Sequence, residues 1–233
     1  VSADVIIIAA AMKHVDLCET NTHECIMTNV IGVKNVLDAV PSGTKTVCFI
    51  STDKACNPGN AYGMCKGLAE IMVQEKASTN LETKFVSVRF GNILGSRGSI
   101  VPALDIMGRD PARQYFALTH PDMNRYVMTT QKATDLVDYA IREGNTGEII
   151  LPELVSMNIK DLFEIYSEKY NKPIVETGLR PGEKVNEVLI SEDQTRRAVR
   201  KGGYLHITRQ MQPDAPTAVE TRILSKDEIV SIL

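Results

Sequence analysis

A strand leads into a helix through the stretch Ser51-Thr52-Asp53-Lys54-Ala55-Cys56-Asn57-Pro58-Gly59-Asn60-Ala61-Tyr62-Gly63-Met64-Cys65-Lys66. Just before it, residues 46–51 form a short apolar run, which is typical of a parallel strand buried on both faces. Tyr62 and Lys66 are four residues apart, so on a helix their phenol and ammonium groups project from one face. Thr52 lies at the carboxyl end of the strand, where open α/β sheets bind ligands. The stretch predicts an α/β fold with polar chemistry at a strand end.

The same alternation of strand and helix continues on both sides of this stretch. We expect strands at 5–10, 46–51, 84–90 and 148–151, and helices at 22–40, about 61–77 and 130–142. This order predicts a doubly wound parallel sheet. Residues 1–152 would form this domain. Residues 153–233, with some residues interleaved from 93–128, would form a small C-terminal substrate-binding lobe and tail.

Within the lobe, the pattern predicts a helix from Asn158 to Tyr170 and a strand at 173–177. Arg180-Pro181-Gly182-Glu183 is expected to open a further helix, and a short helix is expected from Ser225 to Leu233. A Gly-x-Gly-x-x-Gly turn, which normally opens a dinucleotide-binding sheet, does not occur in the sequence. We therefore expect the sequence to begin inside the fold and to lack its first strands.

Composition excludes several classes of function. The formal net charge is -3 and the basic residues are scattered, which argues against a nucleic-acid-binding protein. The longest apolar run, residues 5–12, is far shorter than the roughly 20 residues of a membrane span. Five cysteines without a Cys-x-x-Cys pair favour a reduced cytoplasmic protein, and histidines and cysteines do not combine at metal-ligand spacing. A membrane anchor on a longer parent chain stays open.

A Tyr-x-x-x-Lys spacing alone is weak, because about one is expected by chance in a chain of this size. Its context is a strand ending in Ser-Thr, a loop with Pro58 and a helix beginning at the tyrosine, which resembles the extended short-chain dehydrogenase/reductase family. Ser-Thr-Asp-Lys-Ala followed by Asn-Pro-x-Asn-x-Tyr-Gly-x-x-Lys is similar to the UDP-N-acetylglucosamine 4,6-dehydratases of polysaccharide biosynthesis. Tyr62 is typical of their inverting branch. The resemblance implies a Rossmann-like fold and NADP or NAD as cofactor.

The resemblance also implies how the residues would act. Tyr62, helped by Thr52 and Lys66, would take the proton of the hydroxyl at carbon 4 while bound NAD(P) takes the hydride. Lys54 would then remove the proton at carbon 5, and Asp53 would protonate the hydroxyl that leaves carbon 6. A nearby Lys66 charge is expected to lower the pKa of Tyr62. The hydride would then return to carbon 6, which regenerates the cofactor and gives a UDP-4-keto-6-deoxy sugar.

Further residues match the family's binding segments. The cofactor would be bound by Ala9, Ala10, Ala11, Lys13, Asn29, Tyr62, Lys66 and Phe90. UDP-N-acetylglucosamine would be bound by Lys13, Asn92, Ser99, Arg125, Arg180 and Glu183. Without the family resemblance, the loop from Arg89 to Ser99 would still be interpreted as an anion-binding turn, because a glycine-rich backbone and two arginines suit phosphate. Asn186 departs from the family, which more usually has an aromatic residue there.

Two alternatives stay open. The first is a UDP-hexose 4-epimerase, in which the keto sugar rotates instead of losing water, although Asp53 and Lys54 argue against it. The second is a non-catalytic UDP-sugar-binding fragment, which the absent glycine-rich turn favours. The resemblance also implies a homo-oligomer.

Overall fold

The computed structural model describes residues 2–153, 155–216 and 218–233. The chain divides into two compact units, which are described separately. Unit 1 comprises Val1–Phe90, Thr134–Glu153 and Val188–Val219, and unit 2 comprises Gly91–Ala133, Leu154–Glu187 and Glu220–Leu233. In the part of the chain that the structure describes, no helix is both long and apolar enough to cross a membrane.

Unit 1 is built on a six-stranded sheet whose strand order is β1-β2-β3-β7-β11-β10. Its strands are β1 (Val5–Ile8), β2 (Thr46–Thr52), β3 (Lys84–Phe90), β7 (Ile149–Pro152), β10 (Ala198–Lys201) and β11 (Tyr204–Ile207). The first four in this order pair in parallel, whereas β11 is antiparallel to both β7 and β10. The predicted doubly wound parallel sheet is confirmed.

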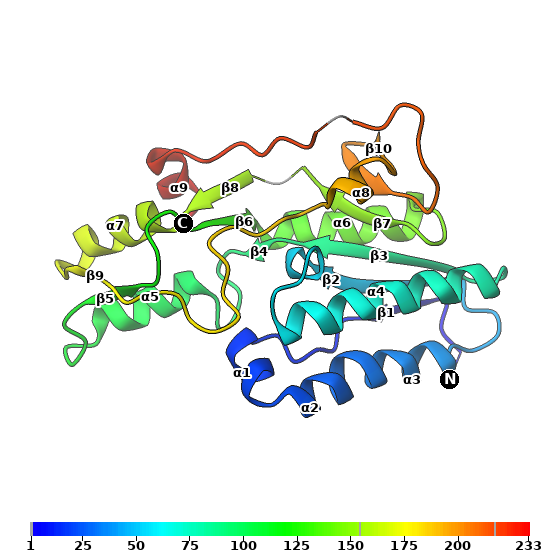
Figure 1. Cartoon of the computed structure of the whole chain (residues 1–233), viewed down its shortest axis with the longest axis horizontal. Helices are drawn as coiled ribbons and strands as arrows, with labels where there is room; N and C mark the ends of the chain where they lie inside the picture. The colour runs from blue at the N-terminus through cyan, green and yellow to red at the C-terminus, as the bar shows by residue number, and fades with distance from the viewer. Residues whose placement is uncertain (1, 154, 217) are drawn as a thin grey trace. The chain divides into compact units, whose positions relative to one another are not determined.

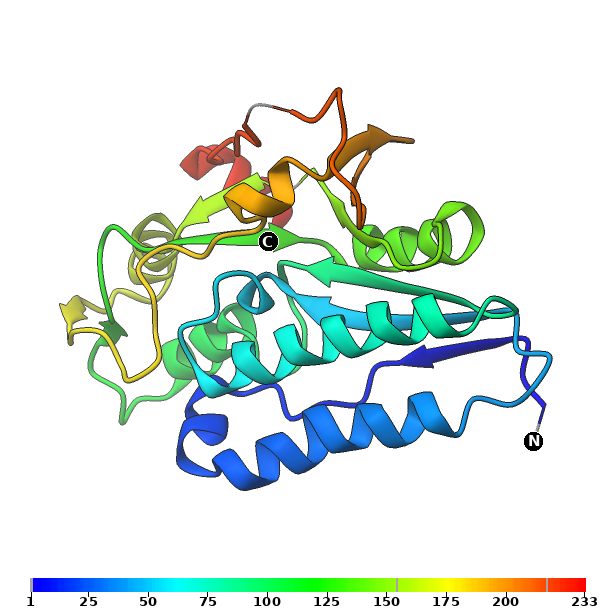
Figure 2. The same cartoon turned by 45° about the vertical axis from the view of Figure 1, so that its right-hand side comes forward.

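Helices cover both faces of this sheet (Figures 1 and 2). The helical elements of unit 1 are α1 (Val15–Thr20), α2 (Thr22–Ile26), the π-helix η1 (Met27–Ile31), α3 (Gly32–Asp38), the 3₁₀ turn η2 (Asp53–Ala55), α4 (Ala61–Thr79), α6 (Thr130–Glu143) and α8 (Glu192–Thr195). Val47 and Phe49 of β2 pack with α3 and α4, and the alternate residue Cys48 packs with α6. A strand buried in this way has no polar face, which explains its continuous apolar sequence.

Residues 188–219 belong to unit 1, whereas the sequence analysis assigned them to the lobe. The physical reason is the hairpin of β10 and β11, which extends the main sheet. His206 of β11 is fully buried and its Nδ1 lies 2.8 Å from Oε2 of Glu148, next to β7. Its Nε2 lies 3.1 Å from the hydroxyl of Tyr139 on α6. The polar contacts thus tie the hairpin to both a strand and a helix of unit 1.

Unit 2 contains a three-stranded sheet in the order β4-β6-β8 and a two-stranded sheet of β5 and β9. Its elements are β4 (Asn92–Ile93), α5 (Ile100–Arg109), β5 (Phe116–Leu118), β6 (Asn124–Met128), β8 (Val155–Asn158), α7 (Ile159–Tyr170), β9 (Ile174–Glu176) and α9 (Lys226–Ile232). Asn158 caps α7 as predicted, since its Oδ1 accepts from the amides of Lys160 and Asp161. The predicted helix after Arg180 is wrong, because Gly182 adopts a φ of 75° there and residues 181–182 form a turn.

Candidate active site

The end of β2 and the start of α4 bring four predicted catalytic residues into one network in unit 1. The Thr52 hydroxyl donates to Oδ1 of Asp53 at 2.9 Å, and the same oxygen accepts from Nζ of Lys54 at 3.0 Å. The hydroxyl of Tyr62 is hydrogen-bonded to Thr52. Asp53 is 1% exposed and the Lys54 side chain 16% exposed. Phenol, hydroxyl, carboxylate and ammonium are therefore linked in a buried setting.

One atom of this network has no partner. Oδ2 of Asp53 is buried and accepts no hydrogen bond from any described residue. Burying a carboxylate oxygen without a donor is costly, so such an atom calls for an explanation. It is the oxygen that a hydroxyl of a ligand could reach without displacing Thr52 or Lys54.

Two glycines let α4 approach the turn that carries Asp53 and Lys54. A Cβ on Gly63 would lie 2.3 Å from the backbone carbonyl oxygen of Lys54, and one on Gly67 would lie 3.1 Å from that of Ala55. Asn60 caps this end of the helix, because its Oδ1 accepts from the Gly63 amide at 2.8 Å. The Tyr-Gly dipeptide thus has a packing reason beside its resemblance to a family motif.

We predict that Gly63→Ala will lower the free energy of unfolding by about 1–3 kcal/mol, since an added methyl group must push the Lys54 carbonyl away. Urea unfolding followed by circular dichroism measures the change. Gly32→Ala is the matched control, because a Cβ there meets its nearest atom at an ordinary 3.5 Å within a helix. The control should be neutral or stabilising by up to about 1 kcal/mol. Equal effects in both variants would contradict the packing argument.

Lys66 differs from its expected role toward Tyr62. Its Nζ donates to the backbone carbonyl of Ile50 at 2.5 Å and lies 4.1 Å from the ring centroid of Phe49. Burial lowers the pKa of Lys66 to about 8, against a smaller raising effect of Glu70. The pKa of Tyr62 is raised, mainly by burial and further by the Asp53 charge, while the Thr52 hydrogen bond lowers it. The expected lowering of the tyrosine pKa by Lys66 is therefore wrong for the protein without ligands.

The predicted cofactor residues lie around the carboxyl end of β1. Ala9, Ala10, Ala11 and Lys13 are exposed in the segment that follows the strand. Asn29, in the π-helix η1, is 1% exposed, and its side chain clamps Met12 by accepting from its amide at 2.8 Å and donating to its carbonyl at 2.9 Å. Asn29 thus supports the exposed segment, and its amide is already occupied. Phe90, at the end of β3, is half-buried.

Arg89 does not serve the anion site that its loop suggested. Its side chain is fully buried, and its guanidinium makes paired contacts with the Glu70 carboxylate at 3.1 and 2.7 Å. Its Nη1 donates to the Leu189 carbonyl at 2.7 Å and to Oε1 of Gln194 at 3.0 Å. A buried arginine needs such partners, so Arg89 is a structural centre of unit 1.

In unit 2, the remaining predicted substrate residues have different surroundings. Ser99 precedes α5, and its buried Oγ has no hydrogen-bond partner among the described residues. Because the first amides of a helix attract anions, this position suits a phosphate oxygen. Asn92 instead holds β4 to β6, since its Nδ2 donates to the Tyr126 carbonyl at 2.9 Å.

Arg125, Arg180 and Glu183 organise the chain between residues 180 and 185. Arg125 donates to the carbonyl oxygens of Lys184 at 2.7 Å and Val185 at 2.8 Å. Arg180 and Glu183 form an ion pair of 3.0 Å in which the arginine side chain is 67% exposed. Burial raises the pKa of Glu183, but the hydrogen bonds from Arg180 outweigh it and the net pKa is lowered.

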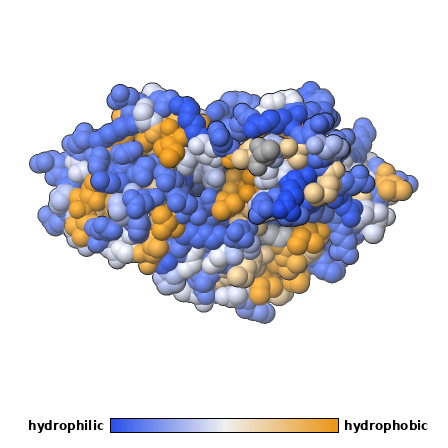
Figure 3. Space-filling view, turned by 45° about the horizontal axis from the view of Figure 1, so that its top comes forward, coloured by the Kyte–Doolittle hydropathy of each residue, from blue (hydrophilic) through white to orange (hydrophobic). Residues whose placement is uncertain are grey.

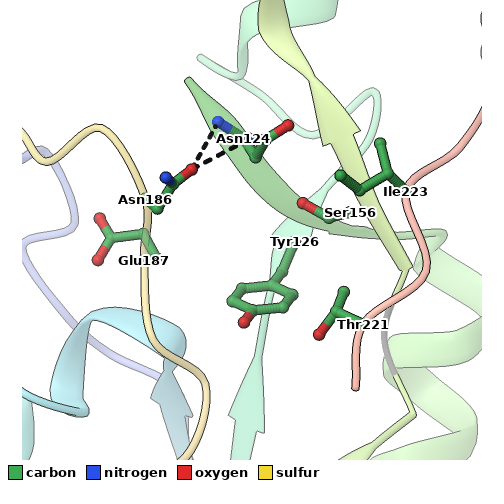
Figure 4. Close-up of a pocket in the computed structure, with 7 residues that line it drawn as sticks. All are labelled: Asn124, Tyr126, Ser156, Asn186, Glu187, Thr221 and Ile223. Carbon is green, nitrogen blue, oxygen red and sulfur yellow. Dashed lines mark hydrogen bonds between the residues drawn. The ribbon is translucent and has the colours of Figure 1, made fainter. Parts of the chain in front are cut away.

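A cavity of about 190 Å³ in unit 2 borders this segment, and sequence reasoning missed it. Its lining comes from β6, β8 and two irregular segments: Asn124, Tyr126, Ser156, Asn186, Glu187, Thr221 and Ile223. In Figure 4 the Asn186 side chain points to Asn124, and the hydroxyls of Ser156 and Thr221 point toward the segment that carries Glu187. Residues this far apart in the sequence give no local signal of a common cavity.

Comparison with known proteins finds relatives that are named as nucleotide-sugar enzymes. A UDP-N-acetylglucosamine 4,6-dehydratase (inverting) of Campylobacter jejuni is 34% identical over 98% of this chain and 66% of that relative. A UDP-glucose 4-epimerase of Rickettsia felis is 36% identical over 88% of this chain and 61% of that relative. The solved structure of Pen from Bacillus thuringiensis is 32% identical, with a TM-score of 0.91 over 98% of this chain and 74% of its own.

The chain thus spans about two thirds or less of the two curated relatives. The family model described as polysaccharide biosynthesis protein matches residues 1–209, which include every site residue predicted from the sequence but not Thr221 and Ile223 of the cavity. The chain therefore belongs to the polysaccharide biosynthesis protein family.

Proposed function

We propose that this chain is the catalytic part of a nucleotide-sugar 4,6-dehydratase that converts UDP-N-acetylglucosamine to a UDP-4-keto-6-deoxy sugar with inversion at carbon 5. The observation that carries the proposal is the buried contact between Asp53 and Lys54, next to Tyr62 through Thr52. Loss of water needs an acid and a base beyond the tyrosine. An epimerase needs neither, so this pair favours the dehydratase.

The buried pair can supply acid and base together. Asp53 and Lys54 are joined by a 3.0 Å hydrogen bond, and transfer of one proton from the ammonium to the carboxylate leaves a neutral amine and a carboxylic acid. The amine of Lys54 then accepts the proton from carbon 5, and Asp53 gives its proton to the hydroxyl leaving carbon 6. These two steps release water and restore the ion pair.

Tyr62 acts before this pair. Its phenol, hydrogen-bonded to Thr52, accepts the proton of the carbon 4 hydroxyl, and the ketone formed there acidifies carbon 5. When bound, NAD or NADP would supply hydride chemistry: the hydride removed from carbon 4 would be delivered to carbon 6 after water has left, and a proton added at carbon 5 would complete the 4-keto-6-deoxy sugar. The small, exposed side chains of Ala9, Ala10 and Ala11 fit a close approach of the nicotinamide end, with Asn29 holding the segment. The whole activity thus combines this chain's acid–base residues with a dinucleotide.

We assign the UDP group to unit 2. The buried Ser99 hydroxyl at the start of α5 and the exposed guanidinium of Arg180 supply donors for diphosphate oxygens. Arg125 contributes by fixing the segment next to Arg180. Glu183 would accept from a ribose hydroxyl.

Self-association is part of the proposal. Met64, Leu68 and Ile71 follow one another along α4 at helical spacing and are 57%, 48% and 61% exposed. On the face shown in Figure 3, hydrophobic side chains form separate patches on a mainly hydrophilic surface. A stripe of exposed apolar side chains on one helix is suited to packing against a second copy of the chain.

Proton NMR of UDP-N-acetylglucosamine in deuterium oxide tests the function, with the chain alone and with its complete reading frame expressed. We expect a new methyl signal at carbon 6, and ring couplings that report inversion at carbon 5. Conversion to the galacto isomer would mean an epimerase, which is the activity named for the Rickettsia felis relative. Binding without any conversion would identify a non-catalytic UDP-sugar-binding protein.

A further inference from the structure

Two carboxylate oxygens occur among the buried, unpartnered side-chain atoms of the described residues. One is Oδ2 of Asp53, for which the proposed reaction provides a hydroxyl partner. The other is Oε2 of Glu187, in unit 2, whose side chain is only 3% exposed. Its paired cation is Lys184, but Nζ lies 3.9 Å from Oε2, which is beyond hydrogen-bond distance. Glu187 therefore resembles Asp53, the proposed acid, in having a buried carboxylate oxygen without a hydrogen-bond donor.

The segment that carries Glu187 is held in place from β6. Arg125 binds the carbonyl oxygens of Lys184 and Val185. The backbone amide and Nδ2 of Asn124 both donate to Oδ1 of Asn186, at 3.2 and 3.1 Å. Figure 4 shows this contact, and it shows the Glu187 carboxylate directed away from the ring of Tyr126. The carboxylate is thus presented by a fixed backbone.

A fixed, buried carboxylate oxygen without a donor is unfavourable unless a ligand supplies one. That ligand must bring an O–H or N–H group. A diphosphate carries acceptors and negative charge, so the carboxylate would repel it. The hydroxyls and the acetamido N–H of a sugar ring are neutral donors and fit the requirement. The ribose hydroxyls and the uracil N–H of UDP are neutral donors too, so a loss of affinity for UDP in the test below would point to them instead.

We infer that Glu187 accepts a hydrogen bond from the sugar ring of the nucleotide sugar and thereby helps to select it. The inference rests on the proposed function and deepens it, because it separates recognition of the sugar from recognition of UDP. Sequence reasoning passed over Glu187, although it noted the unusual Asn186 next to it. The signal is an unpartnered atom, which only the folded chain reveals.

The test compares Glu187→Gln with Glu183→Gln in the protein expressed from its complete reading frame. Without ligand, Glu187→Gln should melt no lower than the wild type, because Oε2 is buried without a hydrogen bond and its ion pair with Lys184 spans 3.9 Å. Glu183→Gln is the matched control and should melt lower, since its carboxylate is satisfied by Arg180. By calorimetry, Glu187→Gln should bind UDP-N-acetylglucosamine roughly 10-fold more weakly and UDP with unchanged affinity.

Each outcome decides a different claim. A lower melting temperature of unliganded Glu187→Gln would show that the carboxylate is structural and overturn the inference. Unchanged affinity of this variant for UDP-N-acetylglucosamine would overturn it too, while leaving the dehydratase intact. If the wild type bound neither UDP nor UDP-N-acetylglucosamine, the proposed function itself would fall, and the inference with it.

Discussion

Asp53→Asn is expected to abolish methyl formation at carbon 6, with a rate loss of about 10²- to 10⁴-fold, the usual contribution of a positioned acid. Asparagine keeps the shape of the side chain and an oxygen that can accept from Thr52 and Lys54. It has no proton to give to the leaving hydroxyl, and it cannot take one from Lys54. Proton NMR measures the methyl signal directly.

The same experiment in deuterium oxide separates the acid from the base. Because asparagine cannot take the proton of Lys54, a base that depends on this transfer leaves carbon 5 unlabelled, whereas deuterium at carbon 5 without methyl formation would mean that Lys54 acts as the base without Asp53. Asp138→Asn is the control, because Asp138 also forms an ion pair, 2.8 Å from Arg142, but its side chain is 62% exposed and outside the candidate site. The control should turn over normally. Dehydration by Asp53→Asn near the wild-type rate would remove Asp53 from the mechanism.

The fold was predictable where the local sequence and the tertiary packing favour the same secondary structure. Strand β3 was predicted at 84–90 and is found there, because Phe85, Val86 and Val88 supply the apolar residues that a strand covered on both faces needs. The turn at Arg180-Pro181-Gly182-Glu183 was mistaken for a helix start. Its Glu183 side chain accepts from the Arg180 amide at 3.2 Å, which satisfies the backbone without a helix. A proline and an acidic residue fit either structure locally.

The candidate site was predictable as far as its residues are neighbours in sequence. Residues 52–66 span one strand end and one helix start, so their meeting follows from local geometry. The role of Arg89 depends on Glu70 and on Leu189, which lies 100 residues away, and no local pattern announces that partner. Likewise, no local sequence pattern shows that Oε2 of Glu187 is buried without a hydrogen-bond donor nearby. Such properties belong to the packed chain.

Lys66→Met is expected to lower the turnover rate by at least about 10²-fold and, at pH 7, to stabilise the fold. The activity argument is electrostatic. Lys66 does not lower the pKa of Tyr62 in the unliganded chain, so we propose that its charge, one helical turn away on α4, acts on the phenol when cofactor and substrate are bound. Since burial lowers the pKa of Lys66 to about 8, wild-type activity should fall as the pH rises through 8. Activity that instead climbs above pH 8 would mean that ionisation of Tyr62 limits the rate and the lysine charge is dispensable.

The stability argument has the opposite sign. The pKa of Lys66 is about 8 in the folded chain and 10.5 in an unconstrained one, so between these values the unfolded chain binds more protons. The free energy of unfolding of the wild type therefore rises with pH across that window, and at pH 7 the buried charge costs about 3 kcal/mol. Methionine avoids this cost, so its advantage in urea unfolding should be largest at pH 7 and shrink toward pH 10.5.

Lys84→Met separates the proposed role from a general effect of a buried lysine. Lys84 also donates to a backbone carbonyl, that of Ile141 at 2.5 Å, and burial also lowers its pKa, but it lies at the other end of its strand from the candidate site. Replacing Lys84 should not change the pH at which activity falls on the alkaline side of the pH–activity profile. A purely structural Lys66 would make the two variants behave alike. If Lys66→Met alone loses activity and gains stability, then Lys66 contributes to catalysis and destabilises the fold.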